Sequence, residues 1–458
     1  MSDEIVGDPH HAALPPGMTP GPDTMRSFRG VLVNTLVSNV TTSFLWFALT
    51  FWAYLETRSV LATSIVGGSF MLLIAVLGPL FGTFVDHHRK RNVMLLSSLL
   101  TLGAYLLAVA TYVLAPPGQL TRFSSPWFWA FVACVLLGSV VEGLRNIALS
   151  TTVTLLVPLE GRDRANGLVG TVAGIGFMIT SVFSGLAIGF LGMGWTLAIS
   201  VGLTAVAVTH LMWVRIPERE PSREGPRVPY DVKGAVRVIR GVPGLFGLVL
   251  FATLNNLIGG VFMALMDPYG LTLFSVQMWG VVLGVTSVGF IIGGAWVARF
   301  GLGARPLRSL LIANLVVAAV GMLFTIRELW WLYAAGILLY MCLIPVAEAA
   351  EQTVLQRVVP FASQGRVFGF ASSLEAAAAP VTAFLIGPIA QNVLIPYMAG
   401  SEGRTDWSWL LGDGTARGIA LVFVLAGVVQ TLVVVGAFGS RTYRTLTRSY
   451  DEAAPARA

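Results

Sequence analysis

Charged residues are scarce in this sequence. Only 11% of its 458 residues are Asp, Glu, Lys or Arg, whereas ordinary soluble domains contain roughly 25%. A soluble chain of this length needs more charge to cover its surface with polar groups. The composition therefore excludes an ordinary soluble protein and favours one whose outer surface contacts lipid.

Cysteine and histidine are also rare, which limits the chemistry of the chain. Cys134 and Cys342 both fall inside apolar runs, so we expect small core residues and no disulfide framework. The five histidines lack metal-site spacing. A Walker sequence is absent, and neither histidines nor aspartates cluster in the apolar runs. We therefore expect no cofactor, no ATP-driven machinery and no membrane-embedded enzyme.

Long apolar runs are what the sequence has in abundance, since 55% of its residues are hydrophobic. A helix needs roughly 20 apolar residues to cross a membrane, whereas barrel strands show short alternating segments. Runs of helical length recur at 30–54, 60–84, 92–115, 127–156, 167–192, 195–216, 243–267, 276–299, 307–326, 330–356, 367–396 and 416–438. The sequence predicts an all-α integral membrane protein with twelve transmembrane helices and both termini on one side.

The loop charges predict which side that is. One set of loops carries most of the basic residues, among them Arg89, Lys90, Arg91, Arg162, Arg164, the 217–242 segment, Arg299, Arg305, Arg308, Arg357, Arg366, Arg441, Arg444 and Arg448. The other set carries Arg58, Arg122, Arg327, Arg404 and Arg417. Basic loops stay in the cytoplasm, so both termini are predicted to be cytoplasmic. The net charge of +6 is then topogenic, and no nucleic-acid partner is expected.

The chain divides at its midpoint. The charged segment 217–242 separates two sets of six spans and is predicted to be a cytoplasmic linker. Val157-Pro158 with Arg164, and Val359-Pro360 with Arg366, repeat at the same offset, which indicates duplication. The predicted domains are a disordered cytoplasmic tail (1–25), an N-terminal bundle (26–216), the linker, a C-terminal bundle (243–440) and a cytoplasmic tail (441–458).

The loop after the second span carries a specific pattern, Gly82-Thr-Phe-Val-Asp86-His-His-Arg89-Lys90-Arg91. It resembles the Gly-x-x-x-Asp-Arg-x-Gly-Arg-Arg motif of the major facilitator superfamily. Gly82 permits close helix approach, and Asp86 can face the positive end of another helix. The resemblance implies that Gly82, Asp86, Arg89, Lys90 and Arg91 lock a cytoplasmic gate. The alternative is that the basic run only fixes topology.

A second resemblance narrows the branch of the family. The segment from Gln356 to Gly369, with Arg366, and the Arg164-Ala165-Asn166-Gly167 run resemble the drug:proton antiporter-3 branch. Its members export macrolides, tetracyclines, other drugs or siderophores, and some move lysophospholipids. The resemblance implies gating roles for Arg164 and Arg366. The fifth span lacks the proline of the antiporter motif, which is a departure from the family pattern.

Charged residues inside spans cost roughly 2.5–3.5 kcal/mol each on insertion scales, so they are functional candidates. Glu142 with Arg145, and Glu348 with Glu351, occupy i, i+3 positions in equivalent spans. Burial disfavours a carboxylate and a nearby Arg favours it, so Glu142 or Glu348 is a candidate proton carrier. The alternatives are a structural Glu142–Arg145 pair and an interfacial position for Glu351.

Polar and aromatic residues of the first and seventh spans are candidates for a substrate cavity: Asn39, Thr42, Trp46, Asn255 and Asn256. Helix–helix hydrogen bonding is the alternative role. The leading hypothesis is a monomeric, proton-coupled exporter of drugs or other amphipathic small molecules, working by alternating access among the lipids of a bacterial cytoplasmic membrane. The alternative is an exporter or flippase of a siderophore or lysophospholipid with the same fold.

Overall fold

The computed structural model describes residues 14–15, 18–57, 60–219, 231–412 and 416–453. All regular structure within these ranges is helical, and no strand occurs there. The bilayer core contains no water that could form hydrogen bonds with backbone N–H and C=O groups, and in a helix these groups bond to one another. The long apolar runs of the sequence therefore become helices.

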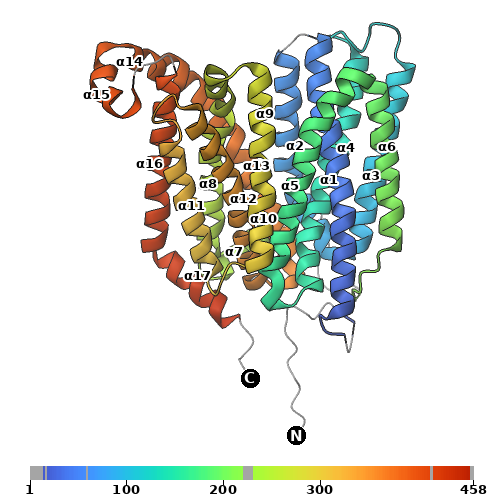
Figure 1. Cartoon of the computed structure of the whole chain (residues 1–458). Helices are drawn as coiled ribbons and strands as arrows, with labels where there is room; N and C mark the ends of the chain where they lie inside the picture. Colours follow the sequence, from blue (N-terminus) through green and yellow to red (C-terminus); the bar gives the residue numbers. More distant parts are fainter. Residues whose placement is uncertain (1–13, 16–17, 58–59, 220–230, 413–415, 454–458) are drawn as a thin grey trace.

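The N-terminal bundle contains six long helices (Figure 1). They are α1 (Pro22–Thr57), α2 (Val60–His87), α3 (Lys90–Leu114), α4 (Pro126–Leu156), α5 (Arg162–Leu186) and α6 (Gly192–Trp213). The short helix η1 (Leu159–Gly161) precedes α5, and a π-helical turn, η2 (Ala187–Leu191), joins α5 to α6. The N-terminus of α4 follows its sequence signals, since the Ser125 side chain accepts the Trp127 N–H and Pro126 occupies the first turn.

The short helix α7 (Val232–Gly241) leads into the C-terminal bundle. That bundle contains α8 (Leu245–Leu273), α9 (Val276–Thr286), α10 (Val288–Phe300), α11 (Pro306–Leu323), α12 (Trp330–Val358), η3 (Phe361–Ser363), α13 (Gln364–Ile389), η4 (Ala390–Leu394), α14 (Ile395–Ala399), α15 (Ser401–Leu411), α16 (Arg417–Gly439) and α17 (Arg441–Glu452). In Figure 1 the two bundles stand side by side, with α2, α5, α10 and α13 where they meet.

The predicted fold class is confirmed. Eleven stretches of the described residues are long and apolar enough to cross a membrane. One of them, Leu159–Trp213, has 55 residues and contains both α5 and α6, so it supplies two crossings. α9 and α10 together form one crossing, from Met278 to Phe300. The chain therefore crosses the membrane twelve times, in two bundles of six.

The predicted tails and linker differ in detail from the structure. Residues 1–13, 16–17 and 220–230 lie outside the described residues. Of the segment 1–25, which is predicted to be disordered, only residues 14–15 and 18–25 are therefore described, and among them Leu14 is buried. The linker forms α7 at its end. Within the predicted tail, α17 packs on the bundle, because Leu446 is buried and the centre of the Tyr450 ring lies 3.9 Å from the Arg357 guanidinium.

Arg417 corrects the predicted loop assignment. The sequence analysis counted it among the loop charges, but it is the first residue of α16 and only 1% exposed. Its guanidinium donates to the carbonyls of Thr325 and Leu411 and to the Tyr269 hydroxyl, and pairs with Glu328 at 3.0 Å. A guanidinium satisfied in this way can be buried at a helix start.

Candidate functional site

Four glycines bring α2 and α13 into backbone contact. A Cβ added at Gly82 would collide with the carbonyl oxygen of Gly365, and one at Gly369 would collide with the carbonyl oxygen of Gly78. Small residues allow this approach between membrane helices. The contact joins the two bundles at the end where α1 begins and α17 lies, which we call the closed end (Figure 1).

Asp86 occupies the centre of the closed end. Its carboxylate accepts the backbone N–H groups of Gly365 and Arg366 at 2.6 and 3.0 Å and the Arg366 Nε–H at 2.9 Å. The first turn of α13 presents free N–H groups and a partial positive charge. An acid at the end of α2 is thus held by the N-terminus of a helix from the other bundle.

Arg366 connects this contact to the linker helix. Its Nη1 donates to Asp231 Oδ2 at 2.9 Å, and Asp231 Oδ1 caps α7 by accepting the Gly234 N–H at 2.7 Å. The Asp231 N–H in turn donates to Thr83 Oγ1 of α2. Asp231 is not among the residues predicted from the sequence, because it resembles any other acid of the linker. Its only local signal is its position immediately before a short amphipathic segment.

The basic run after α2 divides between different contacts. Lys90 is buried and pairs with Glu218 at 3.4 Å, while its ammonium also lies 5.1 Å from the ring centre of Phe361. Arg91 instead donates to the carbonyls of Met212 and Val214 at the end of α6, and the Arg89 side chain is exposed. Of these residues, Lys90 contacts Phe361 of the C-terminal bundle. Arg91 forms its hydrogen bonds within the N-terminal bundle, at the end of α6.

Glu218 is buried beside Lys90, with its side chain only 3% exposed. It accepts the Lys90 backbone N–H at 2.6 Å. Burial raises the pKa of Glu218 above its usual value, and the charges of Lys90 and Arg89 oppose that rise. The start of the linker is therefore fixed to the start of α3.

A second contact closes the same end on the α5 side. The Asp163 carboxylate accepts the backbone N–H of Leu302, just after α10, at 2.9 Å. The buried Arg162 donates to the Gln356 carbonyl at 2.9 Å, and Asn166 Nδ2 donates to the side chains of Gln356 and Thr353. These bonds tie the beginning of α5 to the end of α12.

The repeat arginines Arg164 and Arg366 are not equivalent in their contacts. Arg366 makes two ion pairs, whereas the Arg164 side chain is exposed. Near Arg164 in the sequence, Arg162 is the buried arginine. The residue at the position equivalent to Arg162 in the second half is Gln364, which donates to the carbonyls of Gln356 and Val359. The sequence analysis used Arg162 only as a topology charge, because burial at a loop cannot be read from residue type.

Glycines further from the closed end differ in what surrounds them. A Cβ at Gly170 or Gly174 of α5 would meet Pro345 or Phe290. Further along these helices the surroundings change, since a Cβ would find no atom within 4 Å at Gly67, Gly68, Gly185, Gly280, Gly284 or Gly387. The glycines near the closed end are therefore packed against the other bundle, whereas those further along have open space beside them.

A polar cavity of about 210 Å³ lies inside the C-terminal bundle. Three acids line it: Glu348 and Glu351 of α12 and Glu375 of α13. Glu351 and Glu375 lie within hydrogen-bond reach of each other, and the Glu348 side chain is exposed to the cavity. Glu375 is not among the residues predicted from the sequence, although it is also an acid inside an apolar run, as Glu348 and Glu351 are.

Amides complete the cavity wall. Asn255 and Asn256 of α8 line it, together with Asn314 and Gln430. Gln430 Nε2 donates to Asn255 Oδ1 at 3.1 Å and approaches Asn314 Oδ1 at 3.4 Å. The lining residues include no Lys, Arg or His, so the acids have no cationic side chain among them.

Glu142 and Arg145 lie elsewhere, inside the N-terminal bundle. Their side chains pair at 3.3 Å and are 6% and 0% exposed. Arg145 also donates to Asn34 Oδ1 at 2.6 Å and to Ser98 Oγ, while Asn34 donates to the Ala207 carbonyl of α6. The pair is thus embedded in a network that joins α1, α3, α4 and α6.

The three remaining cavity candidates also belong to the N-terminal bundle. Thr42 is buried, and Trp46 stacks on Phe70 with ring centres 4.4 Å apart. Asn39 faces α5, since its Cβ lies 3.7 Å from the position of a Cβ at Gly176. None of the three lines the acidic cavity.

Among the described residues, no group of three or more His, Cys, Asp or Glu has the geometry to hold a metal ion.

Comparison with known proteins agrees with this architecture. Over 380 residues the chain is 23% identical to macrolide efflux protein A of Streptococcus pyogenes, covering 80% of this chain and 90% of that protein. It is also 23% identical to the enterobactin exporter EntS of Shigella flexneri over 387 residues, covering 83% and 89%.

Solved structures share the fold. The human organic anion transporter MFSD10 superposes with a TM-score of 0.69 at 17% identity, over 90% of this chain and 100% of that chain. The transporter FucP in its outward conformation gives a TM-score of 0.70 at 11% identity, over 92% and 100%.

The family profile described as Major Facilitator Superfamily matches residues 31–383. This range contains the glycine contact, Asp86 and Asp163 of the closed end, and the three acids of the cavity. With twelve crossings in two bundles, this chain belongs to the Major Facilitator Superfamily and is a multi-pass membrane transporter of small molecules, not an enzyme.

Proposed function

We propose that this transporter exports drugs or other amphipathic small molecules in exchange for protons. The observation that carries the proposal is the cavity lined by Glu348, Glu351 and Glu375 with no basic side chain among its lining residues. Two carboxylates within hydrogen-bond reach do not both stay ionised in a low-dielectric site. Such a site binds protons, and it exchanges them when a cationic or neutral substrate arrives.

Alternating access supplies the coupling. In the proposed orientation, both termini and the closed end lie in the cytoplasm of a bacterial cell, and the acids load protons from outside. Export then requires the contacts of Asp86 and Asp163 to break while the two bundles close at the opposite end. Two bundles that rock about a central site perform this cycle. We propose that a single chain, surrounded by lipid, suffices.

Glu142 stays a second proton candidate in this proposal. Its pairing with Arg145 and its place in a hydrogen-bonded network favour a structural role. The acids of the C-terminal bundle border a cavity, whereas Glu142 is nearly enclosed.

A siderophore is the second candidate substrate, because one of the similar proteins is an enterobactin exporter. A lysophospholipid is a further alternative on the same fold. A cavity with three acids and no basic lining residue repels an anion, which favours the drug over an anionic siderophore.

Transport assays separate these candidates. Membrane vesicles containing the chain are loaded with dyes, antibiotics, a catecholate siderophore or a labelled lysophospholipid, with and without an imposed pH gradient. The proposal predicts gradient-dependent extrusion of cationic dyes or antibiotics. Extrusion of the siderophore or lipid alone, or extrusion indifferent to the gradient, contradicts it.

A further inference from the structure

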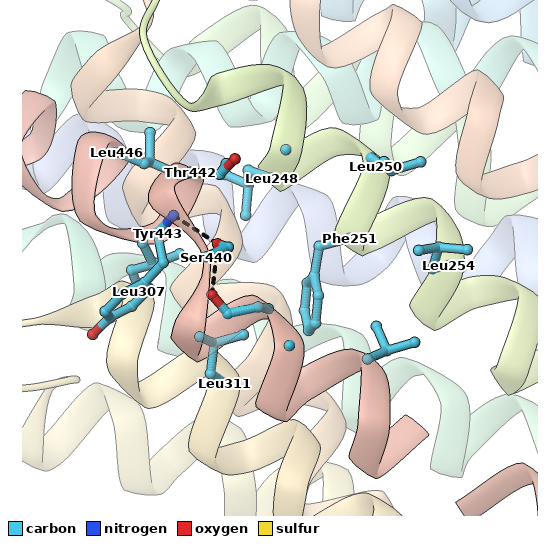
Figure 2. A pocket seen from close by; sticks show the side chains of 14 residues that line it. Leu248, Leu250, Phe251, Leu254, Leu307, Leu311, Ser440, Thr442, Tyr443 and Leu446 are labelled. Atoms are coloured by element: carbon cyan, nitrogen blue, oxygen red, sulfur yellow. Dashed lines mark hydrogen bonds between the residues drawn. The ribbon is translucent and has the colours of Figure 1, made fainter. Parts of the chain in front are cut away.

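An apolar groove opens on the C-terminal bundle beside α17, on the other side of Phe251 from the acidic cavity. It has a volume of about 270 Å³ and lies between α8, α11, α16 and α17. Figure 2 shows its apolar wall, which includes Leu248, Leu250, Phe251, Leu254, Leu307 and Leu311. Leu250 is exposed. The wall residues lie in α8 and α11, which are both long and apolar enough to cross a membrane.

One end of the groove is polar. Ser440, Thr442 and Tyr443 line it where α16 ends and α17 begins (Figure 2). Ser440 Oγ accepts the Tyr443 N–H at 3.1 Å and donates to the Ala437 carbonyl at 2.7 Å, which fixes this corner. A long apolar wall with a hydroxyl-rich mouth matches a molecule that has an apolar chain and a polar head.

The segments that frame the mouth are basic. Arg308 stands between the lining residues Leu307 and Leu311, and Arg441 stands between Ser440 and Thr442. Arg444 follows Tyr443, and all three arginines are exposed. Acidic residues do not occur in α17 before Asp451. Basic pockets between membrane helices at this depth attract anionic lipid head groups.

Gly436 leaves the floor of the groove open. It lines the groove, and a Cβ added there would find no atom within 4 Å. A chain lying in the groove therefore contacts the bare backbone of α16. Phe251 is shared between this groove and the acidic cavity and is itself buried, so its ring forms a wall between them.

We propose that this groove is a binding site for one anionic phospholipid. One acyl chain lies between α8 and α16 against Gly436, and the phosphate is held by Arg308 and Arg441. The lipid then holds α17 against the bundle. Because Tyr450 of α17 contacts Arg357, it also stabilises the position of the end of α12. The proposal does not depend on what the transporter exports.

Native mass spectrometry of the purified full-length chain tests the site. The protein is offered equal amounts of phosphatidylglycerol and phosphatidylcholine with identical acyl chains. We expect preferential retention of phosphatidylglycerol, and a loss of that preference of about fivefold for each of Arg308→Gln and Arg441→Gln, since one arginine near a membrane surface attracts anionic lipid with about this strength.

Two glycine variants separate the groove from general surface charge. Gly436→Leu fills the groove and is expected to reduce retention of both lipids, whereas Gly439→Leu, one turn along α16 and also without a neighbour within 4 Å, is expected to behave as the unmodified chain. Thermal unfolding of each variant verifies folding. Equal retention of the two lipids by the unmodified chain, or undiminished phosphatidylglycerol binding by a folded Gly436→Leu, overturns the proposal.

Discussion

Arg366 and Asp86 form an ion pair across the two bundles, with Arg366 Nε 2.9 Å from Asp86 Oδ2, although 280 residues separate them in the chain. The same guanidinium reaches Asp231 at the start of the linker helix. A single side chain thus joins α13, α2 and α7. Any motion that separates α2 from α13 breaks the ion pair between Arg366 and Asp86.

Asp86→Asn is expected to shift the transporter away from the closed arrangement. The change removes the charge from an acceptor of three hydrogen bonds, and bonds to charged groups contribute about 1.5–3 kcal/mol each. Ser373→Cys, in a chain with Cys134 and Cys342 replaced by Ala, reports the shift, because Ser373 is buried against Gly78. Its reaction with N-ethylmaleimide is expected to accelerate at least about tenfold.

The matched control is Asp23→Asn, which removes a carboxylate whose side chain is 93% exposed. The cysteine introduced by Ser373→Cys is expected to react in this variant at the rate of the parent chain. Unchanged reactivity in Asp86→Asn would show that the Asp86 contacts do not hold the closed end.

Much of the architecture could be predicted from the sequence because bilayer thickness dictates the length of each apolar run. Repeated Val-Pro and Arg positions indicated duplication, and Gly82 with Asp86 identified the loop that makes the α2–α13 contact. These signals are local, so they survive without knowledge of packing.

The partners of those residues could not be predicted in the same way. Asp231 and Arg162 acquire their roles from residues more than 100 positions away, and the sequence around each residue does not name those partners. Arg417 was assigned to a loop because its buried partners come from three separate segments. The omission of Glu375 is different, since its sequence signal was present.

Gly82→Ala is expected to lower thermal stability and transport together. Its new Cβ would collide with the Gly365 carbonyl, which is backbone and cannot rotate away. Gly68→Ala provides the comparison, because the same added methyl meets no atom within 4 Å there and gains up to about 1 kcal/mol of helix propensity. Thermal unfolding should separate the two variants in opposite directions; equal behaviour would mean that α2 and α13 do not approach this closely.

Arg145→Met is expected to be strongly destabilising, by about 3–5 kcal/mol, because it leaves the buried Glu142 without its partner. Glu142→Gln combined with Arg145→Met should recover much of that loss, since no unpaired charge remains. Denaturation of the single and double variants in detergent measures the coupling. Additive losses would argue against a structural pair.

The burial of Glu218 in the linker is expected to make the stability of the folded chain depend on pH. Its pKa in the folded chain is raised above the usual 4.5, so the folded state binds the proton more tightly than the unfolded state. Its contribution to stability is therefore fully present below about pH 4.5 and is lost as the pH rises through the folded-state pKa. Glu218→Gln should flatten this part of the stability profile, and an unchanged profile would contradict the assignment.

Proton movement through the acids of the C-terminal bundle is the central claim, and substrate-driven proton flux tests it most directly. Proteoliposomes containing an internal pH indicator are given the best-transported compound of the panel. The account predicts that the unmodified chain and Glu402→Gln, an exposed control on α15, couple transport to proton flux. Glu348→Gln, Glu351→Gln and Glu375→Gln should each lose or strongly reduce the proton signal. Undiminished flux in all three variants would contradict the account and return the search to Glu142.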